Sequence, residues 1–590
     1  MKNMKKTLAM VMSLCMSASA LAAAGCNKGG GSNSANVLDV YCYIAGYGDS
    51  WLTNDKGTGV LDLFQKEAWV KEKYPDLKVE YTSNGEPGYA INRIYNQKSN
   101  TTDLFFTNWL DNIPMSLVVN LTDAVYATDL PDKPGTKIMD ILGDEVIETL
   151  KRNDAPERSD GYENFYTLRY IKSFYSFMYN KTALEHYEME LPVTTKELEK
   201  AFETVEANGY TYTVSGKTFT STTGLMMCSP SSYIQHMFPV FWTQYEGVDN
   251  YQNYYFGKDA DDQITDANFK QKGRLRAFQT IETLVRDHAW EGAAEADHTE
   301  AQNQFLLGNG LFHWNGDYFT TEMAGEREAN RTRFGVEDNI GMMATPIISD
   351  IVEKLSFYNE EIGEFVEVEK DSNVYLKSVE KPYHMLDADK QEYYDNILAS
   401  IIREIDAGKL YADSTAKTGD DYTVTEADWN IIKAARNIKG SYQVSGQDAA
   451  IPSESPAKAL AADFLRFMYT EKAQLAFSSA SKGLNFPARY YENLSDADYE
   501  EATKNFEQEA KDKFDFMYKS GATIIPSPTG FALGRAGLSH FTYNGNMGLN
   551  IVTTGGSYKT PAQFFLDDIL YYTGENSSNW TTLLQIAGLS

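Results

Sequence analysis

VLDVYCYI, residues 37–44, has the β-branched and aromatic composition of a buried strand. Helical and strand-like patterns alternate after it. Apolar residues recur at helical spacing over 58–74 and 88–98, and strand-like runs lie at 77–81 (LKVEY) and 103–107 (DLFFT). This order is typical of parallel βαβ units with right-handed crossovers. We therefore predict an α/β fold that begins with a parallel sheet.

Hydrogen-bonding side chains follow each of these three strands, and aromatic side chains follow two of them. They are Tyr47, Asp49 and Trp51 after the first strand, Asn84 and Glu86 after the second, and Asn108, Trp109 and Asp111 after the third. Parallel sheets bind ligands beyond the carboxyl ends of their strands. We therefore expect these side chains to contact a ligand. Loop packing of Trp51 and helix capping by Asp111 are the alternatives.

The stretch FLLGNGLFHWNGDYF, residues 305–319, repeats this arrangement. Its GLFHW segment is strand-like, and Trp314, Asp317 and Tyr318 lie at or just after the end of that segment. We expect these three side chains to occupy the same kind of position as those that follow the first strands. Core packing of Trp314 and helix capping by Asp317 are the competing interpretations.

Length and charge limit the class of protein. A chain of 590 residues is too long for one hydrophobic core, because cores stop growing near ~250–300 residues. Two or three lobes are therefore expected. The formal net charge of −30 argues against nucleic acid as a partner, since phosphates require clustered Lys and Arg. The same charge identifies no ligand.

The N-terminus has the features of a secretory signal. Three lysines in the first six residues precede an uncharged stretch over 7–25, which ends in small residues before Cys26. A transmembrane helix is the alternative, but the many Ala and Ser residues disfavour it. Residues 27–36 (NKGGGSNSAN) are rich in Gly and Ser and are expected to form a flexible tether.

The middle of the chain contains a second helical region and an insertion. Thr194 and Glu197 have capping-box spacing at the start of a predicted helix within residues 191–209. Residues 350–440 are charged and mixed in pattern, and we expect them to form an extra subdomain.

Metal and catalytic motifs are weak. The acidic run over 259–262 lacks the Gly and the distal Glu of a calcium loop, so it is interpreted as a turn. The S-x-x-K and K-T-G matches share Lys417 and are attributed to chance. Carboxylate pairs for glycoside hydrolysis stay an open alternative, because the sequence does not give their separation. For Cys42 and Cys228, two buried free thiols are favoured over a disulfide.

Several motifs together resemble the extracellular solute-binding proteins of ABC importers, and most of all their carbohydrate-binding family 1. LAAAGC, ending at Cys26, is similar to a lipobox, whose Cys becomes lipid-modified and N-terminal after cleavage. MYNKTAL (178–184) and LPVTTKEL (191–198) resemble the family's strand into the second lobe and the helix start that follows it. Residues 305–318 resemble its return to the first lobe, SGQDAAIP (445–452) its loop before a second-lobe helix, and GLNFP (483–487) its Gly-to-Pro loop.

The resemblance implies a two-lobe, periplasmic-binding-protein-like fold of type II, with a hinge and a ligand cleft between the lobes. The segments it implies are a signal peptide (1–25), a lipidated Cys and tether (26–36), the first part of the N-lobe (37–170), the first part of the C-lobe (171–309), an N-lobe return and hinge (310–349), the insertion (350–440) and the rest of the C-lobe (441–590).

The implied ligand is a carbohydrate, with an oligosaccharide favoured. Aromatic rings can cover the C–H faces of a sugar, and acidic or amide oxygens can accept its hydroxyl hydrogens. In this interpretation Trp314 is a platform and Asp317 is an acceptor. The residues expected to bind the ligand are Trp314, Trp109, Asp317, Asp111, Trp51, Tyr318, Asp49, Tyr47, Tyr233, Gln447, Gly446 and Glu86.

The resemblance also implies how the protein works. It would be a monomeric lipoprotein held at the cell membrane through Cys26, facing outward, that passes its sugar to permease subunits without catalysis, metal or cofactor. The alternatives are a surface glycoside hydrolase or other polysaccharide-active enzyme, and a peptide-binding lipoprotein, which the length of the chain would fit.

Overall fold

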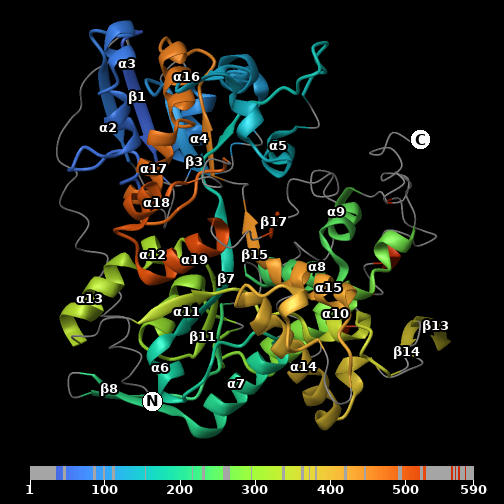
Figure 1. Cartoon of the computed structure of the whole chain (residues 1–590). Coiled ribbons are helices and arrows are strands. Elements are labelled where there is room, and N and C mark those ends of the chain that lie inside the picture. The colour runs from blue at the N-terminus through green and yellow to red at the C-terminus, as the bar shows by residue number, and fades with distance from the viewer. Residues whose placement is uncertain are drawn as a thin grey trace.

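The computed structural model describes residues 35–526 with short gaps, and a few residues further on. The gaps are 44–47, 84–87, 98–99, 109, 111–112, 153–154, 215–216, 229–232, 257–265, 294, 335–338, 361–364, 371–372, 379–381, 418–421, 444–446, 489–493 and 519–522; residues 560, 561, 565, 569–571 and 579 are also described. Two lobes, each built around its own sheet, lie one above the other in Figure 1. The predicted two-lobe α/β architecture is confirmed.

The described residues of the first lobe contain a five-stranded sheet in the order β2-β1-β3-β16-β6. Its strands are β1 (Val37–Cys42), β2 (Lys78–Thr82), β3 (Leu104–Asn108), β6 (Leu168–Arg169) and β16 (Gln447–Ala450). β1 pairs in parallel with β2 and with β3, and α2 (Val60–Phe64), α3 (Ala68–Lys73) and α4 (Tyr89–Tyr95) lie in the connections. The predicted βαβ units are therefore present.

The second lobe is built around β7 (Ser173–Asn180), which is buried along nearly its whole length. Its antiparallel partners are β11 (Phe312–Gly316), β12 (Ile340–Met343) and β15 (Ile438–Gln443), while β10 (Leu225–Met226) and β17 (Thr523–Pro526) extend the sheet. The helices α8 (Ile234–Glu246) and α10 (Lys272–Ile281) pack on each other, and α8 also contacts β7 and β15. Helix α11 (His298–Leu306) contacts β10 and β11, which stand at one end of the strand order.

The expected N-lobe return over 310–349 is wrong. Both strands in that range, β11 and β12, pair with β7 in the second sheet. A buried strand has the same composition in either sheet, so the pattern of residues 305–319 could identify a strand but not its neighbours.

The assignment of all of 441–590 to the C-lobe is also wrong. Strand β16 pairs with β3 and β6 in the first sheet. Helices α16 (Lys458–Phe467) and α17 (Glu471–Ala480) follow it and contact α2. The hydroxyl of Tyr74 donates to Asp463 at 2.7 Å, which ties α16 to the end of α3. Long stretches of sequence separate these partners, and local pattern carries no information on such pairing.

Residues 350–440 pack on the second lobe. They include the hairpin β13 (Phe365–Lys370) and β14 (Asn373–Ser378) and the helices α14 (Ala388–Asp406) and α15 (Glu426–Asn437). Helix α15 contacts α8, and α14 contacts the short helix η8 (Ser349–Lys354).

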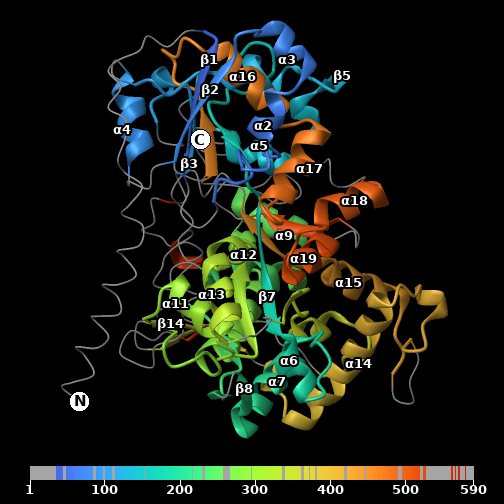
Figure 2. The ribbon, with the colours of Figure 1, turned by 90° about the vertical axis from the view of Figure 1, so that its left-hand side faces the viewer.

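Three connections join the lobes in the described part of the chain. They run from β6 to β7, from β15 to β16, and from α17 to α18 (Asp496–Thr503) and α19 (Gln508–Tyr518). Figures 1 and 2 both show α17, α18 and α19 stacked at the junction of the lobes. The first and third connections are bonded to each other, because the backbone N–H of Lys172 donates to the carbonyl of Asn485 at 2.8 Å. We refer to this bonded pair of connections as the hinge.

Two further expectations concern the membrane and the cysteines. Among the described residues, no helix combines the length and the apolar character needed to cross a bilayer. The predicted signal, Cys26 and most of the tether lie outside the described residues. Cys42 and Cys228 are both buried free thiols, as predicted.

Candidate functional site

The structure describes seven of the twelve residues predicted to bind a ligand. Tyr47, Glu86, Trp109, Asp111 and Gly446 lie outside the described residues. The other seven are Asp49, Trp51, Tyr233, Trp314, Asp317, Tyr318 and Gln447, and they fall into two groups. One group lies at the carboxyl end of the parallel strands of the first sheet. The other lies where β11 ends beside the start of β7.

Trp314 is an interior residue, which corrects the prediction of a ligand platform. Its side chain has 0% exposure, and its indole N–H donates to the carbonyl of Tyr233 at 3.0 Å. Phe177 on β7 packs edge-on against the indole, with ring centroids 5.0 Å apart. The ring is enclosed because β11 lies between β10 and β7 with every residue buried.

Trp51 is likewise a packing residue, which corrects the second expected aromatic contact. Its ring is 1% exposed and lies among Phe106, Tyr170 and Phe477, with centroid distances of 5.0–5.3 Å. Phe477 belongs to α17, so a helix from late in the sequence covers this indole. The alternative of loop packing is therefore the one observed.

Asp317 forms a buried ion pair, which corrects its assignment as a sugar acceptor. Its Oδ2 lies 2.9 Å from Nζ of Lys513, and both side chains are almost fully enclosed. Its backbone N–H donates to the carbonyl of Phe174 at 2.8 Å. Burial raises the pKa of the carboxyl, although the charge of Lys513 opposes that shift.

Tyr233 and Tyr318 belong to an aromatic cluster at the end of the second sheet that is near the hinge. Tyr318 packs edge-on against Tyr175 with centroids 5.7 Å apart, and it also contacts Tyr233 at 6.2 Å. Tyr175 in turn stacks on His236 at 3.7 Å. Desolvation lowers the pKa of His236 to about 3, so this imidazole is neutral at physiological pH. Tyr175 and His236 were not among the predicted residues, and neither has a local sequence signal.

At the first sheet, Asn108 and Gln447 are neighbours across two strands. They are paired residues in the antiparallel register of β3 and β16, so their side chains share one face of the sheet. Oδ1 of Asn108 and Oε1 of Gln447 are both buried, and neither has a hydrogen-bond partner among the described residues. A buried acceptor without a donor costs about 1–3 kcal/mol, so two adjacent cases need an explanation.

The neighbours of this pair hold the strand ends in place. Asp448, next to Gln447, is fully buried; it forms an ion pair with Arg169 and accepts the backbone N–H of Leu110 at 3.3 Å. Asp49 is half-buried and accepts a hydrogen bond from the hydroxyl of Tyr81.

We define Asn108 and Gln447 as the acceptor pair. Gln447 was predicted as a ligand residue, and Asn108 was recognised at the end of its strand.

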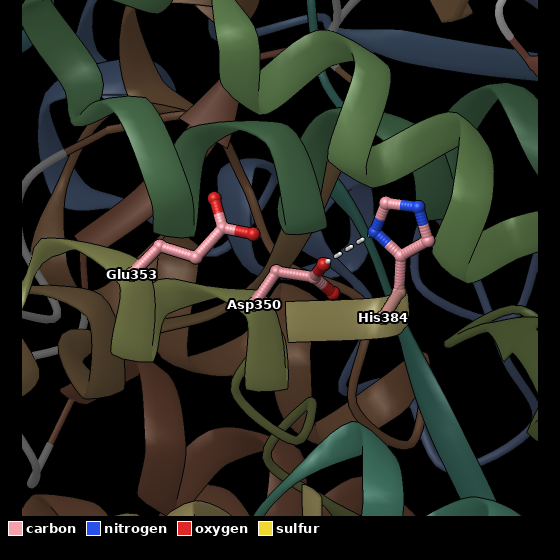
Figure 3. Close-up of side chains that lie close together, drawn as sticks. All are labelled: Asp350, Glu353 and His384. Carbon is pink, nitrogen blue, oxygen red and sulfur yellow. Dashed lines mark ion pairs between the residues drawn. The ribbon is translucent and has the colours of Figure 1, made fainter. Parts of the chain in front are cut away.

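A second cluster of chemistry-bearing groups lies in the second lobe. Single ligand atoms of Asp350, Glu353 and His384 all lie within 4.8 Å of one another, a spacing that could hold a metal ion. Figure 3 shows Asp350 and Glu353 projecting from the same short helix toward one region, with His384 across from Asp350. Ser349, Asp350 and His384 are among the residues that line an adjoining cavity of about 380 Å³.

Arg276 already supplies a cation to this cluster. Its Nε and Nη2 atoms both lie 3.1 Å from Oε2 of Glu353, and Tyr245 and the backbone N–H of Tyr383 also donate to that carboxylate at 2.9 Å. Both oxygens of Glu353 are therefore already hydrogen-bonded, and a guanidinium at this position would repel a metal ion.

The tautomer of His384 follows from the same network. Oε1 of Gln279 accepts from Arg276 at 3.1 Å, so its amide nitrogen donates to Nε2 of His384 at 2.9 Å. The ring hydrogen then lies on Nδ1, which faces Oδ1 of Asp350 at 3.5 Å. Glu353 and Nε2 of His384 are thus hydrogen-bonded, whereas Oδ1 of Asp350 and Nδ1 of His384 face each other without a hydrogen bond to any described residue. The spacing of Asp350 and Glu353 places both on one side of a helix. No local pattern in the sequence predicts Arg276 or His384 as their partners.

Comparison with known proteins gives one family match. Residues 51–475 match the family model described as bacterial extracellular solute-binding protein. No curated protein matches the chain.

Solved structures that match the chain come from several bacteria. One is the GacH receptor of Streptomyces glaucescens, solved without ligand and with acarbose, with 13% identity, a TM-score of 0.47, and coverage of 94% of this chain and 99% of that one. Another, from work on xylan utilization by Caldanaerobius polysaccharolyticus, has 11% identity, a TM-score of 0.45, and coverage of 94% and 99%. A third is a family 1 extracellular solute-binding protein from Bifidobacterium longum subsp. infantis, with 11% identity, a TM-score of 0.43, and coverage of 92% and 100%.

Proposed function

Because the chain belongs to the family of bacterial extracellular solute-binding proteins, we propose that it captures a carbohydrate, with an oligosaccharide favoured, between its two lobes. It then delivers the sugar to the permease of an ABC importer. Binding shifts the population of lobe arrangements toward one in which both lobes contact the ligand. The sugar leaves with all of its covalent bonds intact, so the protein acts as a receptor and not as an enzyme.

The acceptor pair is the observation that carries the choice of ligand. Asn108 and Gln447 bring two buried oxygens without donors to the end of the first sheet where ligands of parallel sheets bind. A sugar presents a row of hydroxyl donors, and two neighbouring hydroxyls would satisfy two neighbouring acceptors. A ligand with only acceptor or apolar groups would leave both oxygens unpaired, at a cost of about 1–3 kcal/mol each.

The proposal also places the protein at the cell surface. Cys26, at the end of the lipobox-like sequence, would carry lipid, and the Gly/Ser-rich residues 27–36 would let a monomeric protein reach the permease from its anchor. Mass spectrometry of the protein from its native host, with Cys26→Ala as the control, tests this part separately. A mature chain that begins elsewhere or carries no acyl groups would contradict it.

Ligand class is tested by thermal shift followed by calorimetry. A panel of mono-, di- and oligosaccharides is compared with a panel of short peptides. A ligand that binds only the folded state at a hundred times its Kd adds about 2.7 kcal/mol of stability. We expect oligosaccharides to raise Tm and mass spectrometry to recover them unchanged. A shift with peptides alone, or cleavage of the sugar, would replace the proposal with one of its two alternatives.

A further inference from the structure

The turn that follows α17 is in direct contact with α19. The turn belongs to the first lobe, since the N–H of Gly483 bonds the carbonyl of Ser478 at 3.0 Å and Ser478 Oγ donates to the carbonyl of Leu484 at 3.1 Å. Gly483 has a φ of +119°, and a Cβ built on it would lie only 2.9 Å from Cβ of Ala510 on α19. Only glycine permits this backbone conformation and this approach.

Helix α19 itself is fixed to the second lobe. Glu509 forms an ion pair with Arg327 at 2.6 Å and accepts a hydrogen bond from Thr320 at 2.9 Å. Asp512 accepts the backbone N–H of Met342 on β12 at 3.0 Å. The contact between Gly483 and α19 is therefore a contact between the two lobes.

We propose that Lys513 on α19 is a tether that sets the angle between the lobes. Its ammonium group is 0% exposed, and it binds two groups from different parts of the molecule. One is Oδ2 of Asp317, 2.9 Å away at the end of β11 in the second lobe. The other is the carbonyl of Gly483, at the exit of the first lobe's last helix.

The chemistry explains why this contact resists lobe rotation. A buried ammonium must keep its charge partner and its acceptors, and a rotation that moved Gly483 away would remove one acceptor from a fully buried side chain. Asn485 extends the network into the hinge: its side-chain nitrogen lies 3.4 Å from Oδ2 of Asp317, and its carbonyl accepts the N–H of Lys172. The tether and two of the three connections are thus joined.

This inference refines the proposed function and rests on it for its effect on ligand binding. The tether lies outside the acceptor pair, so it would act on affinity by changing how often the binding-competent lobe arrangement is populated. If loss of the tether lowers that population tenfold, the apparent Kd rises by about the same factor.

The test measures the distance between lobes without ligand. Spin labels at Glu72→Cys on α3 and Glu203→Cys on α7 (Thr195–Asn208) report on the first and second lobe, in a chain with Cys15 and Cys26 replaced by serine. Both engineered sites are exposed, whereas Cys42 and Cys228 are buried. We expect Lys513→Met to shift and broaden the distance distribution from pulsed electron paramagnetic resonance. Lys511→Met, on the same helix, is the matched control and should leave it unchanged.

A second variant covers the case in which Lys513→Met does not fold, since it leaves Asp317 buried and unpaired. Asp317→Asn combined with Lys513→Met removes both charges together. A folded single or double variant with the wild-type distance distribution overturns the tether. Failure of every sugar to bind wild-type protein would instead overturn the proposed function, because the distance measurement needs no ligand.

Discussion

The two sheets end at the junction of the lobes in very different ways. At the first sheet, Asn108 and Gln447 present two buried oxygens without donors among the described residues. At the second sheet, the indole N–H of Trp314 and Oδ2 of Asp317 have partners within the protein, although Oδ1 of Asp317 has no hydrogen-bond partner among the described residues. The first lobe therefore has unused hydrogen-bonding capacity where a ligand would supply donors. The second lobe uses the indole of Trp314 to pack its core and Oδ2 of Asp317 to bind Lys513 beside the hinge.

The difference arises from partners that are distant in sequence. Asp317 and Lys513 are 196 residues apart, and Trp51 is covered by Phe477 from a late helix. Polar and aromatic residues follow strands in both lobes, so the local pattern is the same. Whether such a residue binds a ligand or packs in the core depends on which distant element reaches it.

The largest expected effect is on Trp314. Trp314→Ala should lower the free energy of unfolding by about 3–5 kcal/mol, because it leaves a large cavity in a closed core. Urea denaturation without ligand measures this, and Trp69→Ala, which truncates a half-buried indole on α3, is the control with a smaller expected loss. A Trp314→Ala protein of wild-type stability that no longer binds sugar would restore the platform interpretation.

The next largest expected effect is the loss of stability that His236 causes on acidification. Burial lowers its pKa to about 3, whereas an unfolded His titrates near ~6.5, so below pH 6.5 the unfolded chain binds a proton that the folded chain does not. Stability should therefore fall on acidification, by about 2–3 kcal/mol from this residue between pH 7 and pH 4.5. His236→Phe keeps a ring against Tyr175 and should flatten the pH dependence of unfolding relative to wild type. His298→Gln, at an exposed position, serves as the control. If the free energy of unfolding depended on pH equally in His236→Phe and in wild type, His236 would not be the buried, neutral imidazole described above.

The smallest expected effect is on the acceptor pair. Asn108→Ala and Gln447→Ala should each weaken sugar binding by about 1 kcal/mol, roughly fivefold in Kd, through the loss of one hydrogen bond. Stability without ligand should stay the same or rise slightly, because a buried acceptor without a donor is removed. Calorimetry and denaturation measure the two quantities, with Asn208→Ala at the end of α7 as the control. A clear loss of stability with unchanged affinity would show that both ends of the sheets serve packing alone.

Local signals in the sequence predicted the parts of the fold that depend on local structure. The alternation over residues 37–107 gave the parallel βαβ units. The cap of α7 (Thr195–Asn208) also forms, with Oγ of Thr194 accepting the N–H of Glu197 at 3.1 Å. The carboxylate of Glu197, however, accepts the N–H of Val193 at 2.9 Å and not that of Thr194.

Assignments that needed long-range pairing were less successful. β11 and β16 were recognised as parts of functional segments but were placed in the wrong lobes, because strand composition does not encode the neighbouring strand. Of the candidate site, Gln447 and Asp317 are both buried and each keeps an oxygen without a hydrogen-bond donor among the described residues, while Trp51 and Trp314 pack in the core. The tether could not be predicted, since a single Lys on an amphipathic helix is ordinarily a solvated residue.

The guanidinium of Arg276 gives the second lobe a counter-ion that is covalently part of the chain. Chelation or dilution cannot remove it, as it could remove a bound calcium or zinc ion. The charge of Glu353 is thus balanced without any ion from the surrounding medium. A receptor that works outside the cell would therefore keep this contact whichever divalent cations its surroundings contain.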